Sequence, residues 1–273
     1  MARGIPVLEC VVNISEGTDD EVIGKLRDAC GDDLLDLHRD PHHNRSVFTL
    51  LGESAPRRLA AAAVASLDLN VHTGVHPRLG VVDVVPFVSL DGAPDDAARA
   101  RDAFATWAAE ALALPCFTYG THRSLPEVRT HAFGDLLPDT GPHRPHLTAG
   151  ACAVGARDVL VAYNVWLPGS CLDTARDVAR EIRQPGLRAL GLAVGKRVQV
   201  SMNLTEPTRV GPADAFDLVS KLAAQHGCDV EGAELVGLIP QEVLNATERG
   251  RWEELDLAEE CTIEWRIAHR SQD

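Results

Sequence analysis

The residues best suited to chemistry are the two histidines and the arginine of HTGVHPR, residues 72–78. A histidine with a pKa of about 6.5 can both accept and donate a proton at neutral pH. The proline at position 77 disfavours the helical region for the residue before it, which predicts an extended conformation for His76. Arg78 can bind a carboxylate through two parallel N–H bonds. The stretch therefore predicts proton transfer by a histidine on an anionic substrate, with a structurally incidental loop histidine as the alternative.

A metal site is the alternative interpretation of this stretch, because His72 and His76 are four positions apart. That spacing places two ligands on one face of a helix, but Gly74 and Pro77 disfavour a helix here. Cys, Asp and Glu are absent at the usual ligand spacing nearby, so we expect no metal. Asp83 has the charge needed to orient an imidazole, although its carboxylate can equally satisfy local main chain.

Two further clusters combine histidines with cationic or amide side chains. In DPHHNRSV, residues 40–47, we expect Asp40, Asn44 and Arg45 to line a substrate site, with Arg45 as an anion contact. A polar hairpin turn would have the same composition. In GPHRPHLTAG, residues 141–150, glycine and proline predict irregular backbone with exposed donors; a solvated linker is the alternative.

Two asparagines interrupt apolar stretches that read as strands, Asn164 in AYNVWL and Asn203 in VSMNL. A buried amide without a partner costs about 1–3 kcal/mol, so each needs a hydrogen-bonding group nearby. A bound ligand could supply it, and so could neighbouring main chain. We include both residues among the substrate-binding candidates.

The elements that must position these residues follow the same order twice. In the first part of the chain, a strand, a helix, two strands, a helix and a strand are expected at 6–15, 18–31, 33–38, 44–52, 55–70 and 80–90. A further helix at 94–114, a strand at 115–120 and a long loop at 121–150 follow. The order then restarts at 157–167, 173–184, 187–195, 197–205, 211–227 and 233–240. This predicts an α+β fold of two tandem ferredoxin-like (βαββαβ) subdomains, residues 1–157 and 158–273.

Composition limits the class of protein. The formal net charge of −14 argues against a nucleic-acid surface, which needs clustered Lys and Arg. No apolar run reaches the roughly 20 residues of a membrane span, and the N-terminus has no signal-peptide core, so we expect a cytoplasmic protein. The seven cysteines form no CxxC pair. Cys10, Cys152 and Cys261 stand in apolar contexts, which predicts buried, reduced thiols and no cysteine zinc site.

Several motifs, in order, make the chain resemble the formiminotransferase domain family. They are ECVVNISEG, NRSVFTLLG, GVHPRLGVVDVVPF, PDTGP, TAGACAVGAR, AYNVWL, QVSMNL and ELVGLIP, and they extend from residue 8 to about residue 245. The resemblance implies two ferredoxin-like subdomains, usually in a homodimer. It also implies transfer of a formimino group from N-formimino-L-glutamate to N5 of tetrahydrofolate, without the cyclodeaminase domain that bifunctional members carry.

The resemblance assigns roles to particular residues. The histidine of the family's HPRxG motif falls on His76, as acid–base. The folate-contacting loop falls on Gly141, Pro142, His143, Arg144, Pro145, His146, Leu147, Thr148, Ala149 and Gly150. Tetrahydrofolate is then a co-substrate, and the small-molecule substrates, both carboxylates, suit Arg45 and Arg78.

The chain also departs from the family pattern. Family members usually have Lys and Glu where this chain has Thr73 and Val75. Animal members have an aspartate at the position of His38, and Asp40 is the expected substitute. The family's Pro-Asn-Phe is Val-Asn-Ile at 12–14. Two alternatives therefore stay open: a diverged member that binds folate or another anion without this transfer or handles a formyl-folate, and a metal-dependent hydrolase.

Overall fold

The computed structural model describes residues 7–74, 78–90 and 94–270. The chain divides into two compact units, which we call the N-terminal unit (Met1–Asp158 with Arg270–Asp273) and the C-terminal unit (Val159–His269). Each unit has its own sheet and its own hydrophobic core. Within the described residues, no helix is both long and apolar enough to span a membrane.

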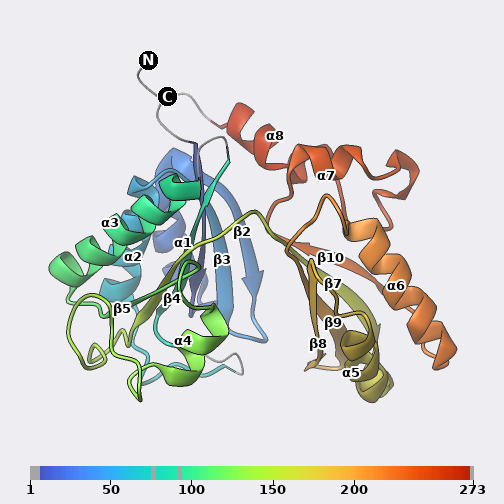
Figure 1. The fold of residues 1–273 in the computed structure, drawn as a ribbon, viewed down its shortest axis with the longest axis horizontal. Coiled ribbons are helices and arrows are strands. Elements are labelled where there is room, and N and C mark those ends of the chain that lie inside the picture. The colour runs from blue at the N-terminus through green and yellow to red at the C-terminus, as the bar shows by residue number, and fades with distance from the viewer. Residues whose placement is uncertain (1–6, 75–77, 91–93, 271–273) are drawn as a thin grey trace. The chain divides into compact units, whose positions relative to one another are not determined.

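The N-terminal unit is built on a six-stranded mixed sheet (Figure 1). Its strands are β1 (Leu8–Ile14), β2 (Leu34–Asp40), β3 (Arg45–Leu51), β4 (Val82–Ser89), β5 (Cys116–Tyr119) and β6 (Cys152–Ala156). Its helices are α1 (Asp20–Cys30), α2 (Ser54–Ser66), α3 (Pro94–Leu112) and α4 (Leu125–His131). The strand order is β2-β3-β1-β4-β6-β5. The first four strands are antiparallel neighbours, and β6 runs parallel to β4 and β5.

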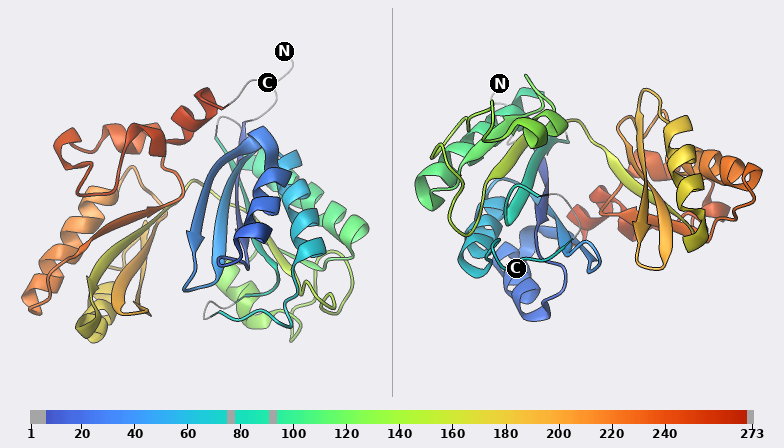
Figure 2. Two further views of the ribbon diagram at one scale, coloured as in Figure 1. Left: turned by 180° about the vertical axis from the view of Figure 1, so that it is seen from behind. Right: turned by 90° about the horizontal axis from the view of Figure 1, so that it is seen from below.

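One face of this sheet packs against α1, α2 and α3, which lie side by side in Figures 1 and 2. Strand residues of alternate positions, such as Cys10, Val12 and Phe48, are fully buried there. On the opposite face, α4 covers β4, β5 and β6 through a smaller cluster around Val128 and Phe117.

Helix α1 illustrates how the local sequence sets an element's bounds. The Asp19 carboxylate accepts hydrogen bonds from the main-chain N–H groups of Glu21 and Val22, at 2.9 and 3.1 Å. Gly31 ends the helix with φ of +60°, a conformation that only glycine adopts at no steric cost. The sequence predicts a helix at 18–31, and the structure confirms a helix there, at Asp20–Cys30.

The C-terminal unit holds a four-stranded antiparallel sheet of order β10-β7-β9-β8. Its strands are β7 (Val161–Pro168), β8 (Leu187–Val194), β9 (Arg197–Leu204) and β10 (Gly232–Val236). Its helices are α5 (Leu172–Glu181), α6 (Pro212–Gln225), α7 (Gln241–Asn245) and α8 (Ile263–Ala268). The core lies between the sheet and α5 and α6, and residues after β10 close it: the Tyr163 hydroxyl donates to the Leu255 carbonyl at 2.8 Å.

The α+β fold with a βαββαβ order in each unit is confirmed. Four helices and strands were not predicted: α4, inside the segment expected to be a loop, strand β6, and the short helices α7 and α8 that follow β10. The cysteine prediction was incomplete. Cys10 and Cys152 are buried free thiols and Cys261 is half-buried, but Cys171 and Cys228 form a disulfide. Burial raises the pKa of the Cys10 and Cys152 thiols well above the ordinary value, which makes them unreactive.

Candidate functional site

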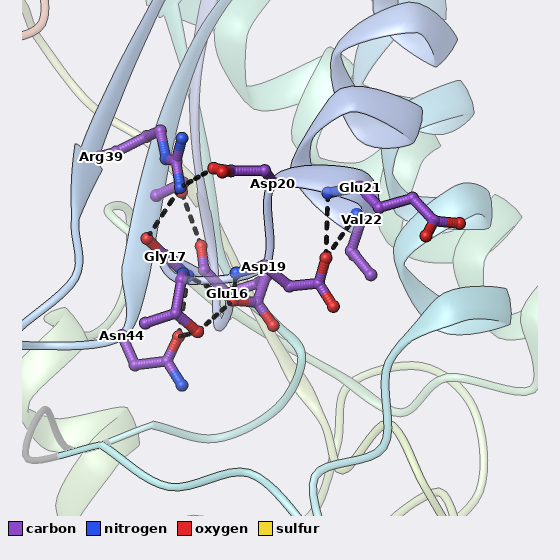
Figure 3. Close-up of polar contacts among 10 residues, drawn as sticks. Glu16, Gly17, Asp19, Asp20, Glu21, Val22, Arg39 and Asn44 are labelled. Atoms are coloured by element: carbon purple, nitrogen blue, oxygen red, sulfur yellow. Dashed lines mark hydrogen bonds and ion pairs between the residues drawn. The ribbon is translucent and has the colours of Figure 1, made fainter.

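Loops of the N-terminal unit that lie far apart in the sequence meet at Asn44, in the turn between β2 and β3. Its side-chain Oδ1 accepts from the Gly17 main-chain N–H at 2.8 Å, a contact drawn in Figure 3. Its Nδ2 donates to the Thr73 carbonyl at 2.7 Å. Asn44 has φ of +48°, a region that asparagine tolerates better than most residues. Its amide thereby joins the loop after β1 and the segment leading to residues 75–77 to one turn.

Glycines allow these loops to touch main chain to main chain. A Cβ atom on Gly17 would lie 2.6 Å from both the Arg45 nitrogen and the Asp40 carbonyl oxygen. A Cβ on Gly74 would lie 2.7 Å from the His43 carbonyl oxygen. Any larger residue at either position would push the loops apart, so both glycines have a steric reason to be there.

The loop after β1 is also braced internally, as Figure 3 shows. One carboxylate oxygen of Glu16 accepts from the Asp19 main-chain N–H at 2.9 Å. From β2, Arg39 pairs with Asp20 at 2.8 Å and donates to the Gly17 carbonyl at 3.3 Å. These contacts hold the Gly17 N–H in place for Asn44.

His72 and Arg78 lie on either side of residues 75–77 and contact each other. His72 Nε2 is 3.1 Å from the Asn44 carbonyl and 3.4 Å from Arg78 Nη1. The carbonyl only accepts and the guanidinium only donates, so Nε2 can bond fully to just one of them. His72 Nδ1 is buried and lacks a hydrogen-bond partner among the residues that the structure describes. Arg78 also donates to the Gly74 carbonyl.

Asp40, at the end of β2, and His43 form a half-buried hydrogen-bonded pair. The His43 ring Nδ1 contacts one Asp40 oxygen, and the His43 main-chain N–H donates to the other at 2.9 Å. Burial acts to raise the pKa of Asp40, but the hydrogen bonds from His43 and the charges of His43 and Arg45 outweigh it and lower that pKa to about 2. Asp40 is therefore a carboxylate at any physiological pH.

Arg45, the first residue of β3, lies among several charges. Burial lowers the pKa of its guanidinium; the charges of Asp40 and Asp83 oppose that shift, and the charge of Arg129 adds to it. Asp83, on β4, is only 2% exposed. Its carboxylate accepts from the Leu79 main-chain N–H at 2.7 Å and from Arg129 at 2.6 Å. The sequence left two roles open for Asp83, orienting an imidazole or bonding local main chain. The described contacts show the second, because its carboxylate accepts from the Leu79 N–H.

The segment 141–150 packs against the residues that follow His76. The Val81 N–H donates to the Ala149 carbonyl and the Ala151 N–H donates to the Leu79 carbonyl, both at 3.0 Å. The approach is close enough that a Cβ on Gly80 would lie 2.2 Å from the Ala151 oxygen. Two of the predicted motifs are therefore neighbours in space.

Within this segment the ten residues differ in exposure. Gly141 to Pro145 and Leu147 are exposed, whereas Ala149 and Gly150 are buried. The ring Nδ1 of His146 accepts from the Ala149 N–H at 3.0 Å, so His146 stabilises the turn of its own segment.

Asn164 and Asn203 belong to the C-terminal unit, on β7 and β9. Both alternate with core residues and so face away from α5 and α6. Asn164 is 8% exposed and donates to the Glu234 carboxylate at 2.9 Å, while Asn203 is exposed. The partner that a buried Asn164 requires is thus a side chain of β10.

His76, the predicted catalytic residue, lies outside the described residues, as does Val75. The structure brings together the neighbours of that segment instead: His72, Gly74 and Arg78 with the turn that holds Asp40, Asn44 and Arg45. In the described part of the chain, no group of three or more His, Cys, Asp or Glu side chains is placed to hold a metal ion.

Sequence reasoning missed the link between Asp83 and Arg129. Arg129 lies on α4, which begins with a capping box: Ser124 Oγ accepts from the Glu127 N–H at 3.4 Å, and the Glu127 carboxylate accepts from the Ser124 N–H at 2.6 Å. The S-x-x-E spacing with a proline in the first turn could have predicted this helix.

Comparisons with known proteins match both units. Residues 7–157 match the formiminotransferase domain, N-terminal subdomain, and residues 162–252 match the formiminotransferase domain. Glutamate formimidoyltransferases of Streptococcus pyogenes and Thermoplasma acidophilum are each 34% identical to 87% of the chain, over 90% and 89% of their own lengths. Formimidoyltransferase-cyclodeaminase of Sus scrofa is 32% identical, and the match covers 51% of that protein. The chain therefore belongs to the formiminotransferase domain family.

Proposed function

We propose that this protein transfers a formimino group from N-formimino-L-glutamate to N5 of tetrahydrofolate. The names of its relatives and its family support such a transfer. The structural observation that supports it best concerns the residues flanking His76. On one side, Thr73 is bonded to the turn of Asn44 and Arg45; on the other, residues 79–81 are bonded to the end of segment 141–150.

His76 is proposed as the acid–base on the sequence motif HPR, since the structure does not describe it. The reaction requires a base that takes a proton from the attacking nitrogen and an acid that gives one to the departing glutamate nitrogen. An imidazole can do both at neutral pH, and a positioned acid–base of this kind contributes about 10²–10⁴ in rate.

Arg45 and Arg78 are proposed to bind carboxylates of the substrates. Arg45 begins β3, directly after Asn44, and the Arg78 guanidinium lies against His72. Asp40 and Asn44 are proposed to line the same substrate site. Asp40 is held there by its contact with His43, and Asn44 by its bonds to Gly17 and Thr73. Asn164 and Asn203 remain substrate-binding predictions in the C-terminal unit.

Segment 141–150 is proposed to contact tetrahydrofolate. Its exposed residues include a cation, Arg144, and an apolar side chain, Leu147, which is 89% exposed. A folate offers carboxylates to the first and an aromatic ring system to the second. The buried end at Ala149 and Gly150 anchors the segment to residues 79–81.

A spectrophotometric assay with tetrahydrofolate and N-formimino-L-glutamate, run beside a calorimetric titration with each compound, tests the function. Formimino transfer that depends on both substrates is the expected result. Binding of tetrahydrofolate without consumption of formiminoglutamate would instead identify a folate-binding protein that lacks this transfer. Sedimentation of the purified protein would test the expected homodimer in the same preparation.

A further inference from the structure

The half-buried ring of His72 is held on one edge by the turn between β2 and β3. Its Nε2 lies 3.1 Å from the main-chain carbonyl oxygen of Asn44. The side chain of the same asparagine donates to the Thr73 carbonyl at 2.7 Å, so two neighbouring bonds join this stretch to the turn. A Cβ on Gly74 would lie 2.7 Å from the His43 carbonyl oxygen, so the next residue packs there as well. The main chain of a neighbouring loop therefore fixes the position of the His72 ring.

The contacts of Nε2 indicate which ring nitrogen of His72 carries the hydrogen. The 3.1 Å to the Asn44 oxygen is an ordinary N–H···O length, whereas the 3.4 Å to Arg78 Nη1 is longer than an ordinary hydrogen bond. A bare Nε2 would face the lone pairs of the carbonyl. A second ring hydrogen would place a positive charge 3.4 Å from a guanidinium. The ring is therefore neutral, with its hydrogen on Nε2 and a lone pair on Nδ1.

The lone pair on Nδ1 is the unusual feature of this ring. Nδ1 is buried, and none of the described residues donates a hydrogen bond to it. A buried acceptor without a donor destabilises the folded state, so such atoms are rare and require an explanation. His146 shows the usual arrangement, because its Nδ1 accepts from the Ala149 N–H at 3.0 Å. His72 thus keeps an acceptor for which the described part of the chain supplies no hydrogen.

We propose that His72 is a second histidine of the reaction site, whose Nδ1 accepts a hydrogen bond from an N–H group of a bound substrate. The inference rests on the proposed function, because it takes the reaction site to lie at the segment that carries His76. The His72 ring also contacts Arg78, the residue proposed to bind a substrate carboxylate. A molecule whose carboxylate reaches Arg78 would therefore lie beside this ring.

Both proposed substrates carry N–H groups that suit this acceptor. N-formimino-L-glutamate has an amidine whose terminal nitrogen carries hydrogen, and tetrahydrofolate has N–H groups on its reduced pterin ring. N-formyl-L-glutamate has an oxygen in place of the terminal amidine nitrogen, and that oxygen only accepts, so it would meet the Nδ1 lone pair with no hydrogen between them. The two sources of the N–H differ in which ligand loses affinity when Nδ1 is removed.

Two amide substitutions separate the two edges of the ring. The side-chain nitrogen of glutamine reaches the place of the histidine Nε2, so His72→Gln keeps the donor to the Asn44 carbonyl and removes the acceptor at Nδ1. Asparagine is shorter, so His72→Asn keeps an acceptor near Nδ1 and removes the bond to Asn44. His131→Gln is the matched control, because the His131 Nδ1 already has a partner, Asp135 Oδ1 at 2.7 Å.

Calorimetry on the wild type and the three variants measures Kd for N-formimino-L-glutamate, N-formyl-L-glutamate and tetrahydrofolate. We expect His72→Gln to weaken the binding of one N–H ligand about tenfold and to leave the Kd of N-formyl-L-glutamate equal or lower. A loss for N-formimino-L-glutamate identifies the amidine as the partner of Nδ1, and a loss for tetrahydrofolate identifies the pterin. His72→Asn should have a lower Tm than His72→Gln but bind that ligand more tightly. His131→Gln should match the wild type throughout.

A His72→Gln variant that binds both N–H ligands as the wild type does overturns the inference. A merely structural ring predicts this result, because glutamine keeps the bond to Asn44. If His72→Gln fails to fold, ring ¹⁵N spectra of the wild type decide, with the His72 signals assigned by their loss in His72→Asn. An Nδ1 signal that shifts when an N–H ligand binds supports the inference, and an unchanged signal overturns it. If the wild type binds these ligands but transfers no formimino group, the proposed function fails, while the binding measurements still decide the role of His72.

Discussion

The side chain of Asn44 donates to the main-chain carbonyl of Thr73 across 29 residues of sequence, at a distance of 2.7 Å. The same amide accepts from Gly17, so one side chain fixes two loops. Asn44→Ala should therefore lower stability by about 1–3 kcal/mol, because the buried Gly17 N–H and the exposed Thr73 carbonyl lose their partner and alanine is strained at positive φ. Urea unfolding measures the loss, and kcat/KM should fall with it.

Asn44→Gly separates the two causes. Glycine accepts a φ of +48° without strain, so this variant loses only the amide. Its stability should lie between those of the wild type and the alanine variant. Equal stability of Asn44→Gly and the wild type would mean that the amide bonds contribute nothing.

His76→Ala should leave the fold intact and reduce turnover by about 10²-fold or more, because it removes the proposed acid–base. Steady-state kinetics together with circular dichroism checks both parts of this prediction. His122→Ala is a suitable control, since His122 is an exposed histidine of the same unit. A His76→Ala variant with wild-type turnover would contradict the proposed acid–base role of this residue.

Stability should depend on pH through Asp40. Its pKa of about 2 in the folded protein is below the ordinary aspartate value, so the pair contributes stability that is fully present above about pH 4 and is lost as the pH falls toward 2. The contribution is about 2 kcal/mol. Unfolding measured from pH 6 to pH 2 should show a smaller decrease in Asp40→Asn than in the wild type; parallel curves would contradict the assignment.

Gly80→Ala should destabilise the protein by about 2 kcal/mol or more, because the new Cβ would meet the Ala151 oxygen at 2.2 Å. Activity should fall as well, since this contact joins the segment after His76 to segment 141–150. Gly24→Ala is the matched control: a Cβ there meets nothing within 4 Å in the middle of α1, so that variant should gain about 0.5–1 kcal/mol. Thermal unfolding of both variants compares them directly.

The disulfide between Cys171 and Cys228 should stabilise the C-terminal unit by about 2–4 kcal/mol, because it closes a loop between residues 57 positions apart. Thiol titration of the denatured, unreduced protein should count five free cysteines, and Cys171→Ser should lower Tm. Cys261→Ser, at a half-buried free thiol, should change Tm little. Seven titratable thiols in air-oxidised protein would show that the bridge does not form.

The sequence predicts best what is decided locally. Helix α1 has its own cap at Asp19 and its own glycine stop at Gly31, and it lies within the helix predicted at 18–31. Helix α4 was not predicted, because glycine and proline are frequent in the surrounding residues and its sequence signal is a capping box of only four residues. The disulfide escaped because cysteine spacing does not determine connectivity.

In the candidate site, too, the sequence predicts what residue types decide and not what long-range packing decides. Residue types alone identified Asp40, Asn44, Arg45 and Arg78 as a polar group, and the structure gathers them at one junction. That Asp83 would meet Arg129, 46 positions away, could not be read from composition or periodicity, because only the packing of α4 on the sheet brings them together.

The position of β6 in the sheet has a consequence for how the chain is made. This strand, Cys152–Ala156, lies between β4 and β5, and β5 adjoins only β6 in the sheet. A nascent chain leaving the ribosome therefore cannot complete the N-terminal sheet until its last strand has emerged. Synthesis that stops before Cys152 would yield four strands that can pair, β1 to β4, and would leave β5 without its neighbour in the sheet.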